Sequence, residues 1–173
     1  LLPQSAITTD FIVGFPGETE GDFRATLDYA ATGVFANAFT FIYSRRRGTP
    51  AARWEQAAPE VAQDRFQRLL SVQNGVTTEY HRRKVGSVVR ALVQGPSKKD
   101  RARLAAKTPD NVTVIAPLPA SIGIEEIART PWLDVVIDTA QVWGITGTIV
   151  RRAVRFADAG LPVAPRVYSL LTA

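Results

Sequence analysis

Two short apolar stretches, at residues 7–13 and 38–42, flank a segment whose apolar residues follow the helical period. Residues 7–13 are apolar and β-branched enough for a buried strand, and the Gly14, Pro16 and Gly17 turn chemistry ends it. Thr19 is then suited to cap a helix, with Asp22 three residues later in an imperfect capping box. The pattern predicts a strand, a tight turn and the start of a helix.

This first helix is predicted to end at Gly33, a residue suited to the left-handed position that follows a helix. Residues 38–42 then read as a second strand, parallel to the first. Such a βαβ unit indicates a parallel α/β fold, in which ligands bind where the strands end. The two strand ends differ in charge, since the first is followed by acidic residues and the second by Arg45, Arg46 and Arg47.

A long helix is expected next, from Pro59 to His81, with Gly75 as a possible interruption. It connects the α/β part to a second unit. Four apolar residues of the α/β part and this helix are assigned to the core: Phe39, Phe41, Phe66 and Leu69.

From Lys84 onward the period changes to two. Segments at 85–93, 104–107, 112–116, 133–140 and 145–150 read as strands separated by turns. About five short strands in some 65 residues are typical of a small closed or nearly closed barrel, similar to the OB fold. Trp132 and Trp143 are expected to pack in this barrel rather than to stack on bases. Residues 151–173 carry no clear pattern and are expected to form an irregular tail.

The chain has 173 residues and a formal net charge of +5, and its cations are unevenly placed. Most of them lie between Arg45 and Lys107, and four crowd one predicted loop at Lys98, Lys99, Arg101 and Arg103. Clustered cations beside β structure favour a polyanionic partner such as nucleic acid, although a merely solvated surface would show the same charge. The charge alone does not distinguish a nucleic-acid-binding surface from a solvated one, and the crowding of cations in one loop favours nucleic-acid binding.

Composition also excludes some chemistry. The chain contains no cysteine, so it can form no disulfide and no cysteine-ligated zinc or iron–sulfur site. Its one histidine, His81, lies in a basic segment and is expected to be a solvated helix residue. No apolar run reaches the ~20 residues that span a membrane, and we expect a cytoplasmic protein without a membrane partner. The chain starts at Leu1 without a methionine, which suggests a piece of a longer protein.

Several motifs together resemble the radical S-adenosylmethionine methylthiotransferases. They are residues 7–23 with the turn Gly-Phe-Pro-Gly-Glu-Thr, residues 38–44, residues 48–52, and Gly95-Pro-Ser-Lys-Lys-Asp100, which is similar to the TRAM module of those enzymes. The resemblance covers about residues 5–150. The strand at 38–44 and the Ser-Lys-Lys-Asp run favour the tRNA branch of the family, which adds a 2-methylthio group to N6-isopentenyladenosine next to the anticodon.

The resemblance implies an α/β part, residues 1–83, that forms the last βα units of a partial TIM-like barrel, followed by a TRAM barrel at 84–150 and the tail at 151–173. It also implies S-adenosylmethionine and two 4Fe-4S clusters in the whole enzyme, and tRNA, through its anticodon stem-loop, as partner of a monomer. The cluster cysteines of the family have no counterpart here. We therefore expect no catalytic residue and no metal ligand in this chain, which alone would bind tRNA without catalysis.

The resemblance further implies two sets of site residues. The cofactor set is Val13, Gly14, Glu18 and Arg46, and the RNA set is Lys98, Lys99, Arg101, Arg103 and Lys107. The sequence departs from the family around Arg46, where Arg45 and Arg47 replace prolines. Two alternatives stay open: part of a methylthiotransferase that modifies a ribosomal protein, and a stand-alone RNA-binding module.

Overall fold

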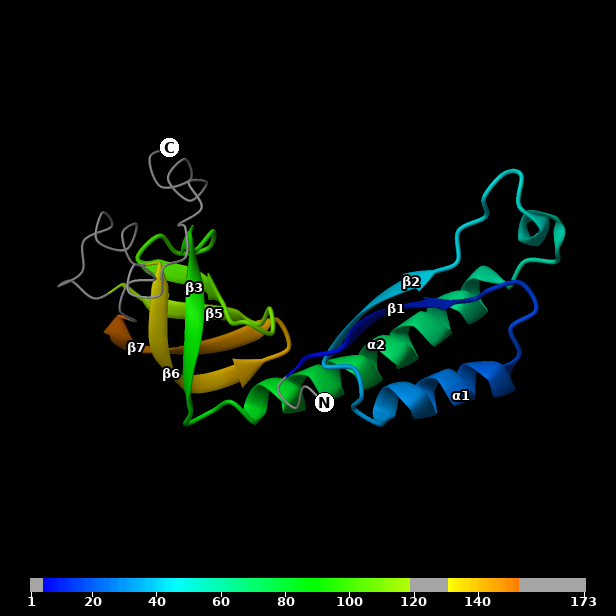
Figure 1. Cartoon of the computed structure of the whole chain (residues 1–173). Coiled ribbons are helices and arrows are strands. Elements are labelled where there is room, and N and C mark those ends of the chain that lie inside the picture. The colour runs from blue at the N-terminus through cyan, green and yellow to red at the C-terminus, as the bar shows by residue number, and fades with distance from the viewer. Residues whose placement is uncertain (1–4, 119–130, 153–173) are drawn as a thin grey trace. The chain divides into compact units, whose positions relative to one another are not determined.

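The computed structural model describes residues 5–118 and 131–152, with side chains up to residue 150 (Figure 1). The expected tail at 151–173 lies outside the described residues, apart from the last two positions of a strand. The chain divides into two compact units, residues 1–80 and 81–173. Each has its own core.

The first unit is a parallel βαβ unit followed by a long helix. Strand β1 (Thr8–Val13) pairs with β2 (Asn37–Ile42) in parallel, and helix α1 (Glu20–Ala31) connects them. A short 3-10 helix η1 (Pro50–Arg53) precedes α2 (Pro59–Arg82), which runs through Gly75 without interruption. The predicted order of elements in this unit is therefore confirmed.

Capping explains where α1 begins and ends. The Thr19 hydroxyl accepts the backbone N–H of Asp22, and the Asp22 carboxylate accepts the N–H of Thr19, so the capping box is complete rather than imperfect. At the other end Thr32 is the C-cap and Gly33 adopts a positive φ of 75°. The left-handed conformation at Gly33 ends the helix, and glycine adopts it without the strain that a residue with a Cβ would have.

Both helices cover the same face of the two-stranded sheet (Figure 1). The core between them is built from Val13, Phe23, Ala30 and Leu69, with Phe11, Leu27, Phe66 and Val72 packed against it. The prediction of a core position was wrong for Phe39 and Phe41, which are 65% and 50% exposed. They alternate onto the opposite face of the sheet, which no described element of this unit covers.

The second unit is a closed five-stranded barrel. Its strands are β3 (Val88–Pro96), β4 (Arg103–Lys107), β5 (Thr113–Pro117), β6 (Trp132–Gln141) and β7 (Gly144–Arg152). Around the barrel the order is β3-β4-β5-β7-β6, with β6 pairing back to β3 and all pairs antiparallel except β5 with β7. The closed barrel that the sequence predicts is confirmed, and its five strands are compatible with an OB-like fold.

Alternation along each strand fills the interior of the barrel. Every second side chain is buried, as with Leu104 and Ala106 on β4, Val114 and Ala116 on β5, and Leu133, Val135 and Ile137 on β6. At Gly147 a Cβ would overlap the carbonyl oxygen of Val136 on the neighbouring strand. Glycine is required there because the two backbones approach too closely for any side chain.

Candidate functional site

Three of the four predicted cofactor residues lie at the end of β1: Val13 is its last residue, and Gly14 and Glu18 belong to the turn that follows. The Gly14 N–H donates to Oε2 of Glu18 at 2.7 Å, so the acid folds back over its own turn. Gly14 has φ +70°, and a Cβ on it would lie 2.7 Å from Cβ of Ala62 on α2. The glycine is thus needed for the turn and for close packing of α2.

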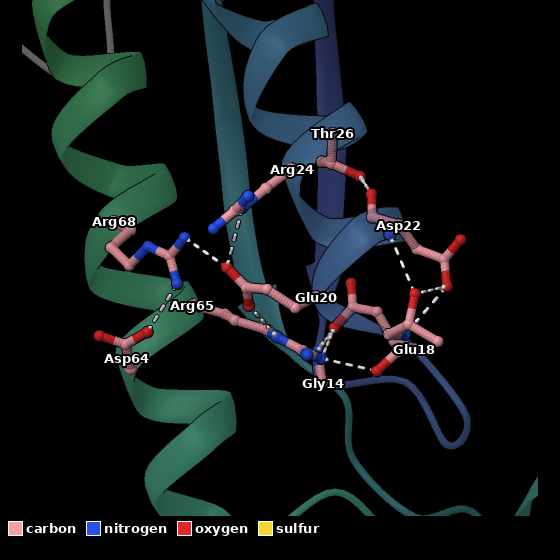
Figure 2. A network of polar contacts seen from close by, with 10 residues as sticks. Gly14, Glu18, Glu20, Asp22, Arg24, Thr26, Asp64, Arg65 and Arg68 are labelled. Atoms are coloured by element: carbon pink, nitrogen blue, oxygen red, sulfur yellow. Dashed lines mark hydrogen bonds and ion pairs between the residues drawn. The ribbon is translucent and has the colours of Figure 1, made fainter.

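Arg65 of α2 binds the Glu18 residue of this turn through two hydrogen bonds (Figure 2). Its Nη1 donates to Oε2 of Glu18 at 2.8 Å and to the Glu18 carbonyl oxygen at 2.9 Å. The arginine and glutamate side chains are only 6% and 11% exposed, so this is a largely buried ion pair. Removing one partner of such a pair costs about 3–5 kcal/mol, since the other charge stays buried.

An exposed charge network continues from this pair along α1 and α2 (Figure 2). Arg68 donates to Glu20 at 2.7 Å and to Asp64 at 2.9 Å, and its hydrogen bond lowers the pKa of the Glu20 carboxyl below its usual value. The Thr19 hydroxyl, followed by the Thr19 backbone, lowers the pKa of Asp22. These contacts keep the start of α1 charged and fixed to α2.

Arg46 lies in the loop that follows β2. Its backbone carbonyl accepts from the N–H and the hydroxyl of Thr49, at 3.3 and 2.9 Å, which closes a turn with Gly48 at φ +84°. The side chains of Arg45, Arg46 and Arg47 are exposed and make no ion pair or hydrogen bond with the described residues. The loop therefore presents three guanidinium groups to solvent.

The four predicted cofactor residues thus differ in how many of their hydrogen-bonding groups are open to a ligand. Gly14 N–H and one carboxylate oxygen of Glu18 are bound within the turn, and the Val13 carbonyl accepts the N–H of Tyr43 at 2.8 Å. Only the Arg46 side chain has all its donors open within the described residues. Any contact made by the other three depends on the shape of the turn or on the remaining Glu18 oxygen.

The hairpin loop between β3 and β4, taken together with the first residue of β4 as residues 97–103, carries four of the five predicted RNA-binding cations and is called the basic loop below. The Ser97 N–H donates to the Arg103 carbonyl at 2.8 Å, and Asp100 Oδ1 accepts the N–H of Ala102 at 2.9 Å. Serine and aspartate thus hold the loop through its backbone. Lys98, Lys99 and Arg101 are exposed and, within the described residues, have no side-chain partner.

Lys107 stands apart from the basic loop. It ends β4, four residues after Arg103, which corresponds to about 13 Å along a strand. Its Nζ donates to the carbonyl of Asn111 at 3.0 Å and so braces the turn before β5. Arg103 is half-buried, and its Nε finds no hydrogen-bond partner in the part of the chain described.

The sequence prediction missed Arg65 and misplaced His81. A row of buried positions follows α2 at four-residue spacing, formed by Arg65, Leu69, Gln73, Thr77 and His81. His81 is 6% exposed rather than solvated, and its Nδ1 lies 2.6 Å from the Gln141 carbonyl. The helical period could have predicted this burial. Arg65 and Gln73 lie four residues before and after Leu69, on the side of the helix that faces the core.

These features define a class: a parallel α/β unit with a charged strand-end turn, continued by a small β-barrel that projects a basic hairpin loop. No protein-family model matches the chain. It is, however, 44% identical over 151 residues to tRNA-2-methylthio-N(6)-dimethylallyladenosine synthase of Acetivibrio thermocellus, which covers 87% of this chain and 30% of that protein. Over the matched stretch the chain is homologous to this family of tRNA methylthiotransferases.

Other relatives carry the same name. The enzyme of Moorella thermoacetica is 41% identical over 150 residues, 86% of this chain and 32% of its own length. That of Corynebacterium jeikeium is 51% identical over 100 residues, 57% of this chain and 20% of its own length. The chain therefore spans about a third or less of the curated relatives it matches. The family resemblance seen in the sequence is confirmed.

Proposed function

We propose that this chain is part of a tRNA methylthiotransferase, in which the basic loop of the barrel grips tRNA. The observation that carries the proposal is the basic loop itself, whose backbone is held by Ser97 and Asp100 while three cations stay unpaired within the described residues. Neutralising phosphates releases counterions, which supplies sequence-independent affinity for nucleic acid. The homology of the chain to enzymes named for a tRNA modification supports tRNA as that nucleic acid.

The reaction proposed for the whole enzyme is the addition of a 2-methylthio group to N6-isopentenyladenosine beside the anticodon. The RNA partner is then the anticodon stem-loop, and the enzyme acts as a monomer in the cytoplasm. Within the described residues, no helix is both long and apolar enough to cross a membrane. The relatives named above all carry the tRNA activity in their names, and nothing favours a ribosomal protein as the substrate.

Residues 1–83 are proposed as the last βα units of a partial TIM-like barrel that binds S-adenosylmethionine, and residues 84–150 as a TRAM module. The exposed face of the β1–β2 sheet supports the first assignment. Ile12 and Phe41 are register partners on that face and are 57% and 50% exposed, beside Phe39. An apolar sheet face of this kind is suited to face the interior of a larger barrel.

For S-adenosylmethionine we propose Val13, Gly14, Glu18 and Arg46 as contacts. The exposed Arg46 guanidinium would pair with the carboxylate of the ligand, and the fixed turn would shape its edge. S-adenosylmethionine, when bound, supplies the methyl group for such a transfer. The 4Fe-4S clusters do not fit this chain, because it has no cysteine to ligate iron. These 173 residues alone should therefore bind tRNA without catalysis.

A titration of the purified chain with tRNA, by filter binding at several salt concentrations, tests the proposal. The double charge reversal Lys98→Glu with Lys99→Glu should weaken binding at least tenfold and reduce the slope of log K against log salt by about 1.5, the effect of losing two phosphate contacts. The matched control is Arg24→Glu with Arg90→Glu, which changes net charge equally at exposed residues paired with Glu20 and Asp134. Equal effects of the two double variants would refute the basic loop as the tRNA grip.

A further inference from the structure

Three aromatic rings meet where β1 and β2 end, and they are called the aromatic triad below. Phe15 lies in the turn after β1, Tyr43 directly follows β2, and Trp54 follows η1. The Phe15 ring centroid lies 4.9 Å from that of Tyr43 and 6.1 Å from that of Trp54, both in edge-to-face geometry. Residues from three separate segments thus form one cluster.

Hydrogen bonds fix the backbone at each of these three positions. The Phe15 carbonyl accepts the N–H of Glu18 at 2.9 Å, and the Tyr43 N–H donates to Val13. The Trp54 carbonyl accepts Nε2 of Gln56 at 2.7 Å, and the same Nε2 reaches the Ala51 carbonyl at 3.1 Å. The backbone that carries the triad is therefore fixed, and the triad presents Phe15 and Trp54 to solvent, which are 41% and 54% exposed, beside the half-buried Tyr43.

Between Tyr43 and Trp54 the chain forms a loop, residues 44–53, called the arginine loop below. It contains Arg45, Arg46, Arg47 and Arg53 and no acidic residue. All four arginines are exposed, and the two ends of the loop are joined through Phe15. Figure 1 shows that this loop leaves the end of the sheet at which β1 also ends.

We propose that the aromatic triad and the arginine loop form a second RNA contact that takes unpaired bases. Exposed aromatic faces stack on bases in single strands, whereas the bases of a duplex are already stacked on each other. Arg45, Arg47 and Arg53 of the arginine loop supply positive charge for the phosphates on either side of a stacked base, while Arg46 is left to the proposed cofactor contact. This inference rests on the proposed function and adds to it a contact for the unpaired part of the RNA, separate from the basic loop.

The test is fluorescence anisotropy of the whole chain with a labelled ten-nucleotide single-stranded RNA and with a ten-base-pair RNA duplex. Trp54→Ala should weaken single-strand binding by about 5- to 150-fold, the range that stacking of one base accounts for, and leave duplex binding unchanged. Tyr29→Ala is the matched control. Tyr29 is 53% exposed, packs edge-to-face on one ring, Phe35, and lies on α1 outside the triad.

A second variant, Arg45→Gln with Arg47→Gln, should lower the affinity of both RNAs and the salt slope, since it removes charge and keeps the triad. Equal single-strand affinities of Trp54→Ala and Tyr29→Ala would overturn the proposal, as would equal displacement of the single strand by an acidic peptide and by unlabelled RNA. Reversal of Lys98 and Lys99 separates the two ideas. If that reversal abolishes tRNA binding while Trp54→Ala leaves the affinity for single-stranded RNA unchanged, the proposed function is supported and the second RNA contact is refuted.

Discussion

Arg65 shows how much one side chain can decide in this molecule. It is 5% exposed, donates twice to Glu18 and lies with its guanidinium carbon 5.6 Å from the centre of the Phe23 ring. It ties the turn after β1, which holds Gly14 and Glu18 of the proposed cofactor set, to the N-terminal half of α2. A buried arginine of this kind positions backbone rather than contacting a ligand.

Replacing Arg65 by alanine should therefore lower the free energy of unfolding by about 3 kcal/mol, because the Glu18 carboxylate stays largely buried without its partner. Urea unfolding measures this loss, and amide hydrogen exchange at Gly14 should speed up with it. Arg68→Ala is the control, since Arg68 is 38% exposed and its loss should cost under ~1 kcal/mol. Equal costs of the two variants would contradict a special role for Arg65.

The two lowered carboxyl pKa values at the start of α1 have different causes, and each can be removed separately. Thr19→Ala should raise the pKa of Asp22 and leave Glu20 unchanged, whereas Arg68→Ala should raise the pKa of Glu20 and leave Asp22 unchanged. Carbon-detected NMR titration of the side-chain carboxyls reads both. A shift of both groups in either variant would contradict the separate causes.

These shifts also set the pH dependence of α1. Because the folded-state pKa values lie below the ordinary values of 4.5 for Glu20 and 3.8 for Asp22, the stability that these two carboxylates contribute is fully present above those ordinary values. It is lost as pH falls from there through the folded-state values. Stability should fall over that acid range, and Thr19→Ala should flatten the part that comes from Asp22.

At the scale of elements, α2 combines a buried polar row with an exposed glycine. Gln73 donates through Nε2 to the Phe35 carbonyl at 3.3 Å and to the Thr77 hydroxyl at 3.2 Å, so part of the row is satisfied inside the first unit. Gly75 sits on the opposite side, where an added Cβ would meet nothing within 4 Å. The helix persists through Gly75 because packing on both of its flanks outweighs the weak propensity of one glycine.

Gly75→Ala should consequently stabilise the chain by about 0.5–1 kcal/mol, because alanine loses less backbone entropy in a helix. Gly14→Ala provides the contrast. Its Cβ would lie 2.7 Å from Cβ of Ala62 and its φ is positive, so it should destabilise by about 1–3 kcal/mol. Thermal unfolding measures both, and a change of the same sign in the two variants would count against this account.

On the scale of the whole molecule, the chain has two cores and two surfaces that we propose to bind RNA, but no thiolate. Anaerobic incubation with iron and sulfide should therefore leave its absorption spectrum without the charge-transfer bands of a 4Fe-4S cluster. The same preparation should still bind tRNA with the salt dependence described above. Cluster absorbance at stoichiometric iron would overturn the argument from composition.

Much of the fold could be predicted because the decisive signals are local. Apolar β-branched stretches, the helical period, the Thr19–Asp22 capping box and Gly33 identified the elements of the first unit, and a two-residue period with spaced turns identified a barrel. The crowding of Lys98, Lys99 and Arg101 in one loop followed from adjacency in sequence. These are properties of neighbouring residues, which the sequence by itself determines.

Tertiary structure alone decided what depends on distant residues. Apolar composition could not reveal that Phe39 and Phe41 face away from the helices, since strand alternation assigns faces only once the packing partners are known. Arg65 meets Glu18 across 47 positions, and the aromatic triad joins residues 15, 43 and 54. Contacts between residues so far apart arise when parallel strands end at one edge and α2 packs beside them, which no local pattern encodes.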